Sequence, residues 1–369
     1  MIRIPLSYNS INTVALSSIL ERYQGKHHNQ ITRDFEDQLA AVVGAKYAVA
    51  LNSGTAAIHL ALLAIGVKQN DVVVAPTFTY VATLNPVLYV GATPVLIDSE
   101  RTTWNIDPEL LRVSLQAQSK QGKLPKAIVI VHTYGTPACL NEIMETANQY
   151  EIPVIEDAAE SLGATYQGKS VGTFGEIGIF SFNNNKAVTG FGGGAIVTNN
   201  SHLAAKARFL AAQAREDFQF YEHRNIGFNY GINPLAAAYA LSQLVDIEKF
   251  TIKRKTLFKN YKQLAPDTFI TQQEPTGVSS GRWLSTFLLP EDADGVGMVA
   301  ALKQAGIEAR SVWKPMHQQP LLGTKPAYLN GNSDDFFKRG ICLPSGNNLD
   351  EATQNEIISV MNRLLQRGY

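Results

Sequence analysis

The chain has 369 residues, of which 45% are hydrophobic and 17% are charged. That length is sufficient for a deep core and for two domains. Lys and Arg together number 32, as do Asp and Glu, so the formal net charge is zero. This balance excludes the overall basic surplus by which proteins attract nucleic acid or anionic membranes, and we expect neither partner.

The cysteines and the first residues of the chain indicate its compartment. Cys139 and Cys342 each lack a second thiol nearby in the sequence. Isolated cysteines of this kind are typical of reduced core thiols in a cytoplasmic protein. The opening stretch MIRIPLSYNS has no apolar run of signal-peptide length, and no segment reaches about 18 uninterrupted apolar residues. We therefore expect a cytoplasmic protein.

Short apolar runs alternate with helical patterns from about residue 46 onward. The runs that predict strands span residues 47–52, 71–76, 94–98, 126–135, 152–157, 177–182 and 194–200. Helical patterns at 53–66, 80–91 and 139–150 lie between them. Strands that alternate with helices favour βαβ units and a mostly parallel sheet. Because the strands are nearly all apolar, helices are expected on both sheet faces, and the fold class is α/β.

A long helical pattern over residues 233–265 marks the passage to a second domain. Pro234 can open this helix, and its length predicts that it leaves one domain and enters another. We place the boundary near residue 248, which gives a large domain 1–248 and a small C-terminal α+β domain 249–369. The small domain is predicted to contain strands at 285–290 and 307–313 and helices at 296–306 and 350–367.

Two strand ends carry groups suited to an anionic ligand. The stretch NSGTAAIHLAL predicts a strand end, a tight turn and a helix start, where the backbone N–H groups of Gly54 and Thr55 would suit a phosphate. An ordinary helix N-cap is the alternative. The stretch IPVIEDAAES places Glu156 and Asp157 after four apolar residues, where a carboxylate needs a cation or a strong donor. Here too an N-cap is the alternative.

The stretch FSFNNNKAVTGFGGGAIV, residues 180–197, sets Lys186 between an asparagine-rich turn and a glycine loop. A lysine in a partly desolvated site becomes a nucleophilic amine suited to a Schiff base, although most lysines are surface residues. The glycines permit close backbone approach to a ligand, or form a simple hairpin. A phosphate turn, a buried acid and a lysine together are what pyridoxal phosphate requires, since they bind its phosphate, its ring nitrogen and its aldehyde.

Further motifs occur along nearly the whole chain: FEDQLAAVVGAKYAVALNSGTAAIHLAL, PTFTYVATLNPVLYVGATPVLID, HTYGTPACL, IPVIEDAAESLGA, FSFNNNK, GGGAIVTN, IGFNYGINPLAAA, ARSVWKPMHQQP and LPSG. In this order they resemble the DegT/DnrJ/StrS family of nucleotide-sugar aminotransferases. The resemblance implies the type I fold of pyridoxal phosphate-dependent transferases. That fold has a large domain with a mostly parallel seven-stranded sheet and a small C-terminal α+β domain.

The resemblance also implies roles for residues near the cofactor ring. Lys186 would bond to the cofactor and shuttle a proton between the cofactor carbon and the sugar carbon. Asp157 would pair with the ring nitrogen, and Glu160 would contact the phenolic oxygen, where many relatives have Gln. Tyr80 would stack on the ring, and Asn183 would lie near the substrate. No metal ion is expected.

Other matching positions concern the phosphate and the substrate. Gly54 and Thr55 would bind the phosphate through backbone amides, and Ser181 would add its hydroxyl group. Asn229 in GFNYG would reach the phosphate from a neighbouring subunit, which implies a homodimer with a shared active site. His317 in KPMHQQP either lines the substrate pocket or is a structural turn residue. Taken singly, the other side chains also have structural interpretations, such as a core tyrosine or a turn asparagine.

The chain departs from the family pattern at two positions. Gly231 stands where relatives commonly have Arg, and Pro234 stands where Asn or Asp is common. The missing guanidinium leaves open how the neighbouring subunit meets the phosphate or the substrate. Lys186 is retained, whereas sugar dehydratases of the family have His at that position.

The function implied is transfer of an amino group from L-glutamate to a nucleotide-linked keto-deoxysugar, for polysaccharide or glycan biosynthesis. The motif FSFNNNK is most similar to members that aminate C4 of UDP-linked 4-keto-6-deoxy N-acetyl sugars. Two alternatives are amination of a non-nucleotide keto compound, as in the aminohydroxybenzoate branch, and a non-catalytic regulatory homologue. Fold alone does not decide between them.

Overall fold

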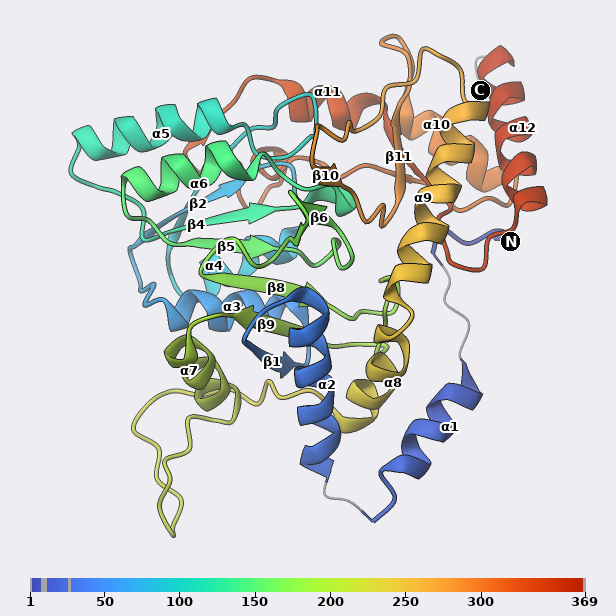
Figure 1. The fold of residues 1–369 in the computed structure, drawn as a ribbon. Coiled ribbons are helices and arrows are strands. Elements are labelled where there is room, and N and C mark those ends of the chain that lie inside the picture. Colours follow the sequence, from blue (N-terminus) through green and yellow to red (C-terminus); the bar gives the residue numbers. More distant parts are fainter. Residues whose placement is uncertain (1, 8–11, 26–27, 368–369) are drawn as a thin grey trace.

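The centre of the molecule is a sheet of eight strands. The computed structural model describes residues 2–7, 12–25 and 28–367, and its main sheet has the order β1-β9-β8-β5-β4-β2-β3-β13 (Figure 1). These strands are β1 (Tyr47–Leu51), β2 (Val72–Pro76), β3 (Thr93–Ile97), β4 (Ala127–Val131), β5 (Val154–Asp157), β8 (Ile177–Ser181), β9 (Gly194–Thr198) and β13 (Ala327–Tyr328). Neighbours from β8 to β13 are parallel, whereas β9 is antiparallel to both β8 and β1. The predicted α/β fold with a mostly parallel sheet is confirmed.

The sheet has one strand more than the seven predicted. The additional strand, β13, pairs with β3 through Ala327 opposite Leu96 and Tyr328 opposite Ile97. Two residues without an apolar run carry no strand pattern, so this pairing depends on the path of the C-terminal third of the chain. The seven predicted strands are all present, and the count is corrected to eight.

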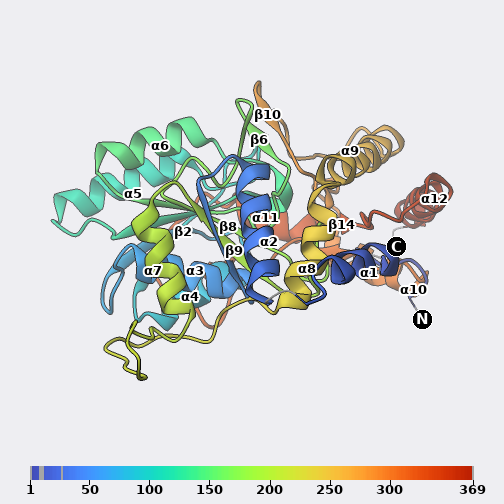
Figure 2. The ribbon, with the colours of Figure 1, turned by 60° about the horizontal axis from the view of Figure 1, so that its bottom comes forward.

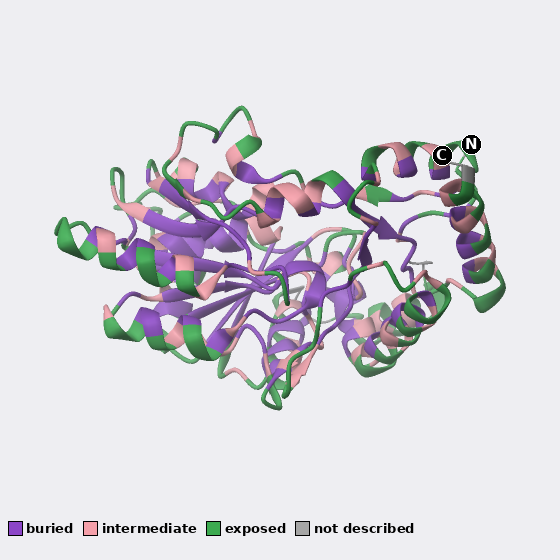
Figure 3. Cartoon of the chain, turned by 90° about the horizontal axis from the view of Figure 1, so that it is seen from above, coloured by how far each residue is buried: buried purple, intermediate pink, exposed green. Residues whose placement is uncertain are grey.

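Helices cover both faces of the sheet because the strand residues alternate between two apolar cores. Ile128 and Ile130 of β4 belong to one core, and Ala127 and Val129 belong to the other. Figure 3 shows the buried strands between helices whose outer faces are exposed. The first core is covered by α2 (His28–Val43), α5 (Pro108–Lys120), α6 (Leu140–Gln149) and α8 (Pro234–Leu244). The second is covered by α3 (Gly54–Ala64), α4 (Asn85–Tyr89) and α7 (Ser201–Ala211).

The C-terminal part forms a smaller α+β unit with its own core, at the right of Figure 1. Its antiparallel sheet has the order β11-β14-β12. Its elements are α9 (Ile247–Leu264), β11 (Ser285–Leu288), α10 (Gly295–Gln304), β12 (Arg310–Ser311), α11 (Asn332–Arg339), β14 (Gly340–Leu343) and α12 (Glu351–Arg367). The helix predicted over 233–265 is in fact two helices, since α8 ends at Leu244 and α9 begins at Ile247. The domain boundary near residue 248 stays a prediction.

Minor elements complete the described chain. The helix α1 (Thr13–Arg22) lies beside α8, as Figure 2 shows, and the Asn12 N–H donates to the Tyr239 hydroxyl at 3.1 Å. A small sheet contains β6 (Thr165–Tyr166), β7 (Lys169–Ser170) and β10 (Val278–Ser279), and short 3₁₀ helices are η1 (Val81–Thr83), η2 (Thr133–Gly135) and η3 (Met316–Gln318). None of the helices in the described ranges has the length and apolarity needed to span a lipid bilayer.

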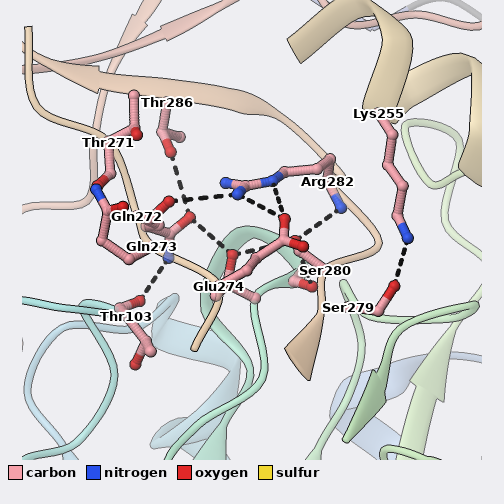
Figure 4. A network of polar contacts seen from close by, with 12 residues as sticks. Thr103, Lys255, Thr271, Gln272, Gln273, Glu274, Ser279, Ser280, Arg282 and Thr286 are labelled. Atoms are coloured by element: carbon pink, nitrogen blue, oxygen red, sulfur yellow. Dashed lines mark hydrogen bonds and ion pairs between the residues drawn. The ribbon is translucent and has the colours of Figure 1, made fainter. Parts of the chain in front are cut away.

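Buried polar contacts join the C-terminal unit to loops at the ends of the main-sheet strands (Figure 4). Gln272 is central, because its Nε2 donates to the carbonyl oxygens of Thr103 and Thr133 at 2.7 and 3.0 Å. Its Oε1 accepts from the hydroxyl groups of Thr136 and Thr286 at 3.2 and 3.3 Å. These contacts fix the two parts relative to each other beside the candidate site.

Candidate active site

A cavity of about 320 Å³ lies where β4, β5 and β8 end. In open α/β sheets this edge is the usual position of ligands. The lining contains most of the residues predicted from the sequence: Gly54, Thr55, Tyr80, Asp157, Glu160, Ser181, Asn183 and Lys186. Residues that lie far apart in the chain therefore meet in one place.

One end of the cavity is built for an anion. Ser53 caps α3 by accepting the Ala56 N–H at 3.1 Å, and the first intrahelical bond runs from Ala57 to the Ser53 carbonyl. The N–H groups of Gly54 and Thr55 therefore point out of the helix start, where the helix dipole favours negative charge. A Cβ atom on Gly54 would lie 3.3 Å from the Ser181 Cβ and 3.6 Å from its Oγ, so the Ser181 hydroxyl adjoins this turn.

The glycine loop packs against the same turn. A Cβ atom on Gly194 would lie 2.3 Å from the Ser53 carbonyl carbon and 2.5 Å from the Gly54 nitrogen, distances that no side chain tolerates. The Gly193 N–H donates to the Asn52 carbonyl at 3.0 Å. Gly193 and Gly194 thus approach the protein backbone closely, and this packing fixes the turn that carries Gly54. Close approach of the glycines to a ligand stays a prediction.

Asp157 ends β5 within the cavity lining and is buried. Its Oδ2 accepts the Thr83 hydroxyl at 2.7 Å and its Oδ1 accepts the Ala159 N–H at 3.2 Å. Burial raises the pKa of Asp157, and the bonds from Thr83 and Ala159 oppose this rise. The carboxylate is therefore held in one orientation and is poised to gain from a cationic partner.

The neighbouring Glu156 has a structural role instead. Its two oxygens accept N–H groups from Gly172, Phe174 and Gly175 at 2.6 to 2.8 Å. His132 Nδ1 accepts the Ala138 N–H at 3.1 Å, so its Nε2 carries the proton and donates to Glu156 at 3.0 Å. The three backbone N–H bonds of this carboxylate stabilise the loop after β7. The cavity lining includes Asp157 but not Glu156.

Lys186 and Glu160 meet inside the cavity. Lys186 Nζ lies 3.4 Å from Glu160 Oε1, and the side chains are 12% and 8% exposed. Glu160 Oε2 accepts the Tyr134 N–H at 2.9 Å. Burial raises the pKa of Glu160 to about 7, an effect that Lys186 and the Tyr134 N–H partly offset. The site therefore holds a carboxyl group that titrates near neutral pH beside the lysine.

An aromatic wall from the C-terminal unit closes the other side, and sequence reasoning missed it. The rings of Tyr134 and Trp313 stack with centroids 4.3 Å apart, and those of Tyr134 and Trp283 lie 6.2 Å apart and nearly parallel. Trp283, Trp313 and Arg310 all line the cavity. The motif ARSVWKPMHQQP contained two of them, but nothing in its residues indicated that they would face Lys186.

Two predicted residues lie outside this cavity. Asn229 lines a separate surface hollow of about 870 Å³ beside Gly231 and Arg208. His317 Nδ1 lies 2.8 Å from the Thr77 hydroxyl, and its Nε2 lies 2.9 Å from Asp334 Oδ1. Both ring nitrogens of His317 thus have protein partners that join β2 to α11, which fits its structural interpretation.

Comparisons with known proteins identify the family. A sequence profile described as the DegT/DnrJ/EryC1/StrS aminotransferase family matches residues 10–362. The chain belongs to this family. EpsN of Bacillus subtilis (strain 168), named as a pyridoxal phosphate-dependent aminotransferase, is 45% identical over 337 residues, which cover 90% of this chain and 87% of EpsN.

Two further family members support the same conclusion. A GDP-perosamine synthase of Caulobacter vibrioides is 35% identical over 343 residues, 90% of this chain and 89% of that protein. The crystal structure of a DegT/DnrJ/EryC1/StrS aminotransferase from Brucella abortus superposes with a TM-score of 0.86 at 28% identity, covering 95% of this chain and 94% of that one. The protein is therefore a pyridoxal phosphate-dependent aminotransferase with the fold of this family.

The residues present fit the family's cofactor. The start of α3 and Ser181 offer donors for a phosphate, and Asp157 offers a carboxylate for a pyridinium nitrogen. Asn185 also lines the cavity, and its buried Oδ1 lacks a protein partner. When bound, pyridoxal phosphate supplies an electron sink for the reacting carbon.

Proposed function

We propose that this aminotransferase moves an amino group from L-glutamate to the keto carbon of a nucleotide-linked deoxysugar. The preferred substrate is a UDP-linked 4-keto-6-deoxy N-acetyl sugar aminated at C4. The single observation that carries the proposal is the meeting of Lys186, Asp157 and the α3 start around one cavity. The biological context would be polysaccharide or glycan biosynthesis in the cytoplasm.

We assign the individual roles from the family resemblance, and the positions of these residues on the cavity lining support them. Lys186 bonds to the cofactor and then carries the proton, and Asp157 holds the ring nitrogen. Tyr80 is 57% exposed and lines the cavity, which suits an aromatic that covers the cofactor ring. Glu160 would meet the phenolic oxygen, and Asn183 would lie near the sugar; both residues line the cavity.

A second candidate substrate is a GDP-linked keto sugar. The Caulobacter relative is a GDP-perosamine synthase at 35% identity, which favours a GDP carrier as much as the FSFNNNK motif favours UDP. The third alternative is amination of a non-nucleotide keto compound. Free nucleotides would not compete with such a substrate, whereas they would compete with a nucleotide-linked sugar.

We further propose that the protein works as a homodimer that shares its active sites. Phe220, Tyr221 and Ile226 are 63%, 78% and 84% exposed on the loop between α7 and α8, which projects from the body in Figure 1. Exposed apolar groups on such an arm suit contact with a second copy. Asn229 follows on the same loop and would reach the partner's phosphate site.

The first experiment is an absorbance spectrum of the protein with pyridoxal phosphate, followed by L-glutamate. A visible band that glutamate removes would establish cofactor and donor, and nucleotide-linked keto sugars that restore it would identify the acceptor. Lys186→Ala should lose both the band and turnover, whereas Lys169→Ala, on the exposed β7 strand, should keep both. Turnover retained by Lys186→Ala would refute the proposal. Competition by UDP but not GDP, or the reverse, would decide the carrier.

A further inference from the structure

Trp283 contacts Lys186 and also the residue before it. The Lys186 Nζ lies 4.0 Å from the centroid of the Trp283 ring, in cation–π geometry. The indole Nε1–H of Trp283 donates to the carbonyl oxygen of Asn185, the residue before the lysine, at 2.9 Å. One side chain thus contacts the reactive nitrogen and also anchors the backbone that carries it.

The ring is itself held firmly. The Trp283 N–H donates to the Tyr134 carbonyl at 3.0 Å, and the Trp283 carbonyl accepts from the buried Arg254 guanidinium. Gly135 has φ +95°, and a Cβ atom there would lie 2.8 Å from the Trp283 nitrogen. This close backbone approach leaves Trp283 little freedom to shift, so its position is set before any ligand arrives.

Charged and titratable groups surround Lys186 from several elements. Asp157 and Glu160 follow β5, and Glu160 is the nearer at 3.4 Å from Nζ. Arg310 of β12 and Tyr80 line the same cavity, and Tyr134 contacts Glu160 through its N–H. In addition to these groups, the face of the Trp283 ring attracts the ammonium form of Lys186. The neutral amine gains little, because the ring quadrupole acts mainly on a positive charge.

We propose that Trp283 is a positioning residue of the aminotransferase reaction, whose ring face seats the Lys186 ammonium group whenever that group is not bonded to the cofactor. The proposal rests on the role of Lys186 given under the proposed function. During proton transfer Nζ gains one proton from a carbon and later returns one, so amine and ammonium alternate without net change. The seat keeps the ammonium beside the reacting carbon instead of allowing it to move into solvent.

The test compares Trp283→Phe with Trp283→Leu. Both variants lose the indole N–H and much of the volume, but only Phe keeps an aromatic face. The readout is the rate at which the visible band appears when pyridoxal phosphate is added to the full chain, measured against pH. Lys186 must be a neutral amine to bond to pyridoxal phosphate. The pH at which the rate of band formation is half-maximal therefore reports the ionisation of Lys186. We expect the midpoint to fall in the order Trp, Phe, Leu, by about 0.5 to 1 pH unit in total.

Phe258→Leu is the matched control. The Arg282 guanidinium lies 3.7 Å from the Phe258 ring centroid, so this variant removes an aromatic ring beneath a cation one residue away from Trp283. It should keep the wild-type midpoint. Turnover adds a second readout, since Trp283→Leu should lower kcat about five- to tenfold with little change in KM, and Trp283→Phe should lie between Leu and wild type.

Each outcome decides the matter. Equal pH midpoints for Trp283→Phe and Trp283→Leu, or a midpoint shift of the same size in Phe258→Leu, would overturn the positioning role of Trp283. Either result would leave the aminotransferase assignment intact. A wild-type protein that never forms the band would overturn the proposed function and the seat together. If Trp283→Leu does not fold, Trp283→Met replaces it as the variant without a ring, and the same comparison with Phe applies.

Discussion

Glu160 Oε1 lies 3.4 Å from Lys186 Nζ, and both side chains are almost withdrawn from solvent. Burial raises the pKa of Glu160 to about 7 despite the nearby ammonium, while its ordinary value is 4.5. In the unfolded chain the carboxyl therefore ionises first, and the folded chain retains its proton over a higher pH range. Stability from this group is full below about pH 4.5 and is lost as pH rises toward about 7.

Glu160→Gln should remove this dependence. With no cofactor added, the free energy of unfolding of the variant relative to wild type should rise between pH 5 and pH 8, by about 3 kcal/mol at most. Urea unfolding at several pH values measures the difference. The pKa of Asp157 is also raised. This carboxyl group therefore gives the stability of both proteins a pH dependence of the same sign, which cancels in the difference between them.

The control for this prediction is Glu356→Gln. Arg3 lowers the pKa of the exposed Glu356, so this carboxylate is ionised throughout the range and its variant should track wild type. A difference between Glu160→Gln and wild type that does not change with pH would show that Glu160 is already ionised at pH 5.

Thr83 stabilises the ionised form of Asp157 through a hydrogen bond. Its hydroxyl donates to Oδ2 at 2.7 Å and opposes the rise in pKa that burial imposes. Thr83→Val should raise that pKa further and move the acid limb of the kcat/KM profile to higher pH by about one unit. Activity should recover as pH rises, whereas Asp157→Asn should be impaired at every pH. Thr83→Ser keeps the hydroxyl and should restore the wild-type profile; a shifted limb in that variant would contradict the argument.

Sequence patterns predicted the parts of the site that depend on strand ends. Apolar runs located β5 and β8, and parallel strands deliver their carboxyl ends to one edge, so Asp157 and Lys186 were predicted to lie at the same edge. The family motifs then gave Tyr80 and Glu160 their positions. These residues do share one cavity.

Contacts between distant segments were not predictable in the same way. The aromatic wall arises because Trp283 and Trp313 come from the C-terminal unit and stack on Tyr134, a residue at φ 53°. No local sequence pattern predicts these contacts, because they depend on the path of the chain from α9 back to the main sheet. The sequence left two interpretations of His317 open, and the contacts of its ring with Thr77 and Asp334 fit the structural one.

The packing of Gly194 against the α3 turn predicts a strong size limit. Gly194→Ala would place a methyl group 2.3 Å from the Ser53 carbonyl carbon, so the turn must shift and the affinity for pyridoxal phosphate should fall at least tenfold, with stability lower by about 1 to 3 kcal/mol. Gly192→Ala is the matched comparison, because a Cβ there meets no atom within 4 Å, and its melting temperature should stay near wild type. Equal melting temperatures for the two variants would contradict this account of the loop.

Gln272 offers the clearest test of how the two parts are joined. Gln272 is 2% exposed. Its amide bonds two carbonyl oxygens and the Thr136 hydroxyl across the junction, and the Thr286 hydroxyl within its own unit. Gln272→Leu leaves the Thr286 hydroxyl without its partner. It also removes one of two hydrogen bonds at each of the Thr103 carbonyl, the Thr133 carbonyl and the Thr136 hydroxyl. We therefore expect the free energy of unfolding in urea to fall by about 1 to 3 kcal/mol.

Gln273→Leu makes the same chemical change one residue along. Its side-chain amide donates to the Thr271 carbonyl within its own segment, at 2.8 Å, and Gln273 is exposed, so the loss should stay within about 0.5 kcal/mol. Because the junction also positions Trp283 and Arg310, Gln272→Leu should weaken pyridoxal phosphate binding while Gln273→Leu should not. Equal unfolding midpoints for the two variants would mean that water replaces the lost amide and that Gln272 does not stabilise the junction.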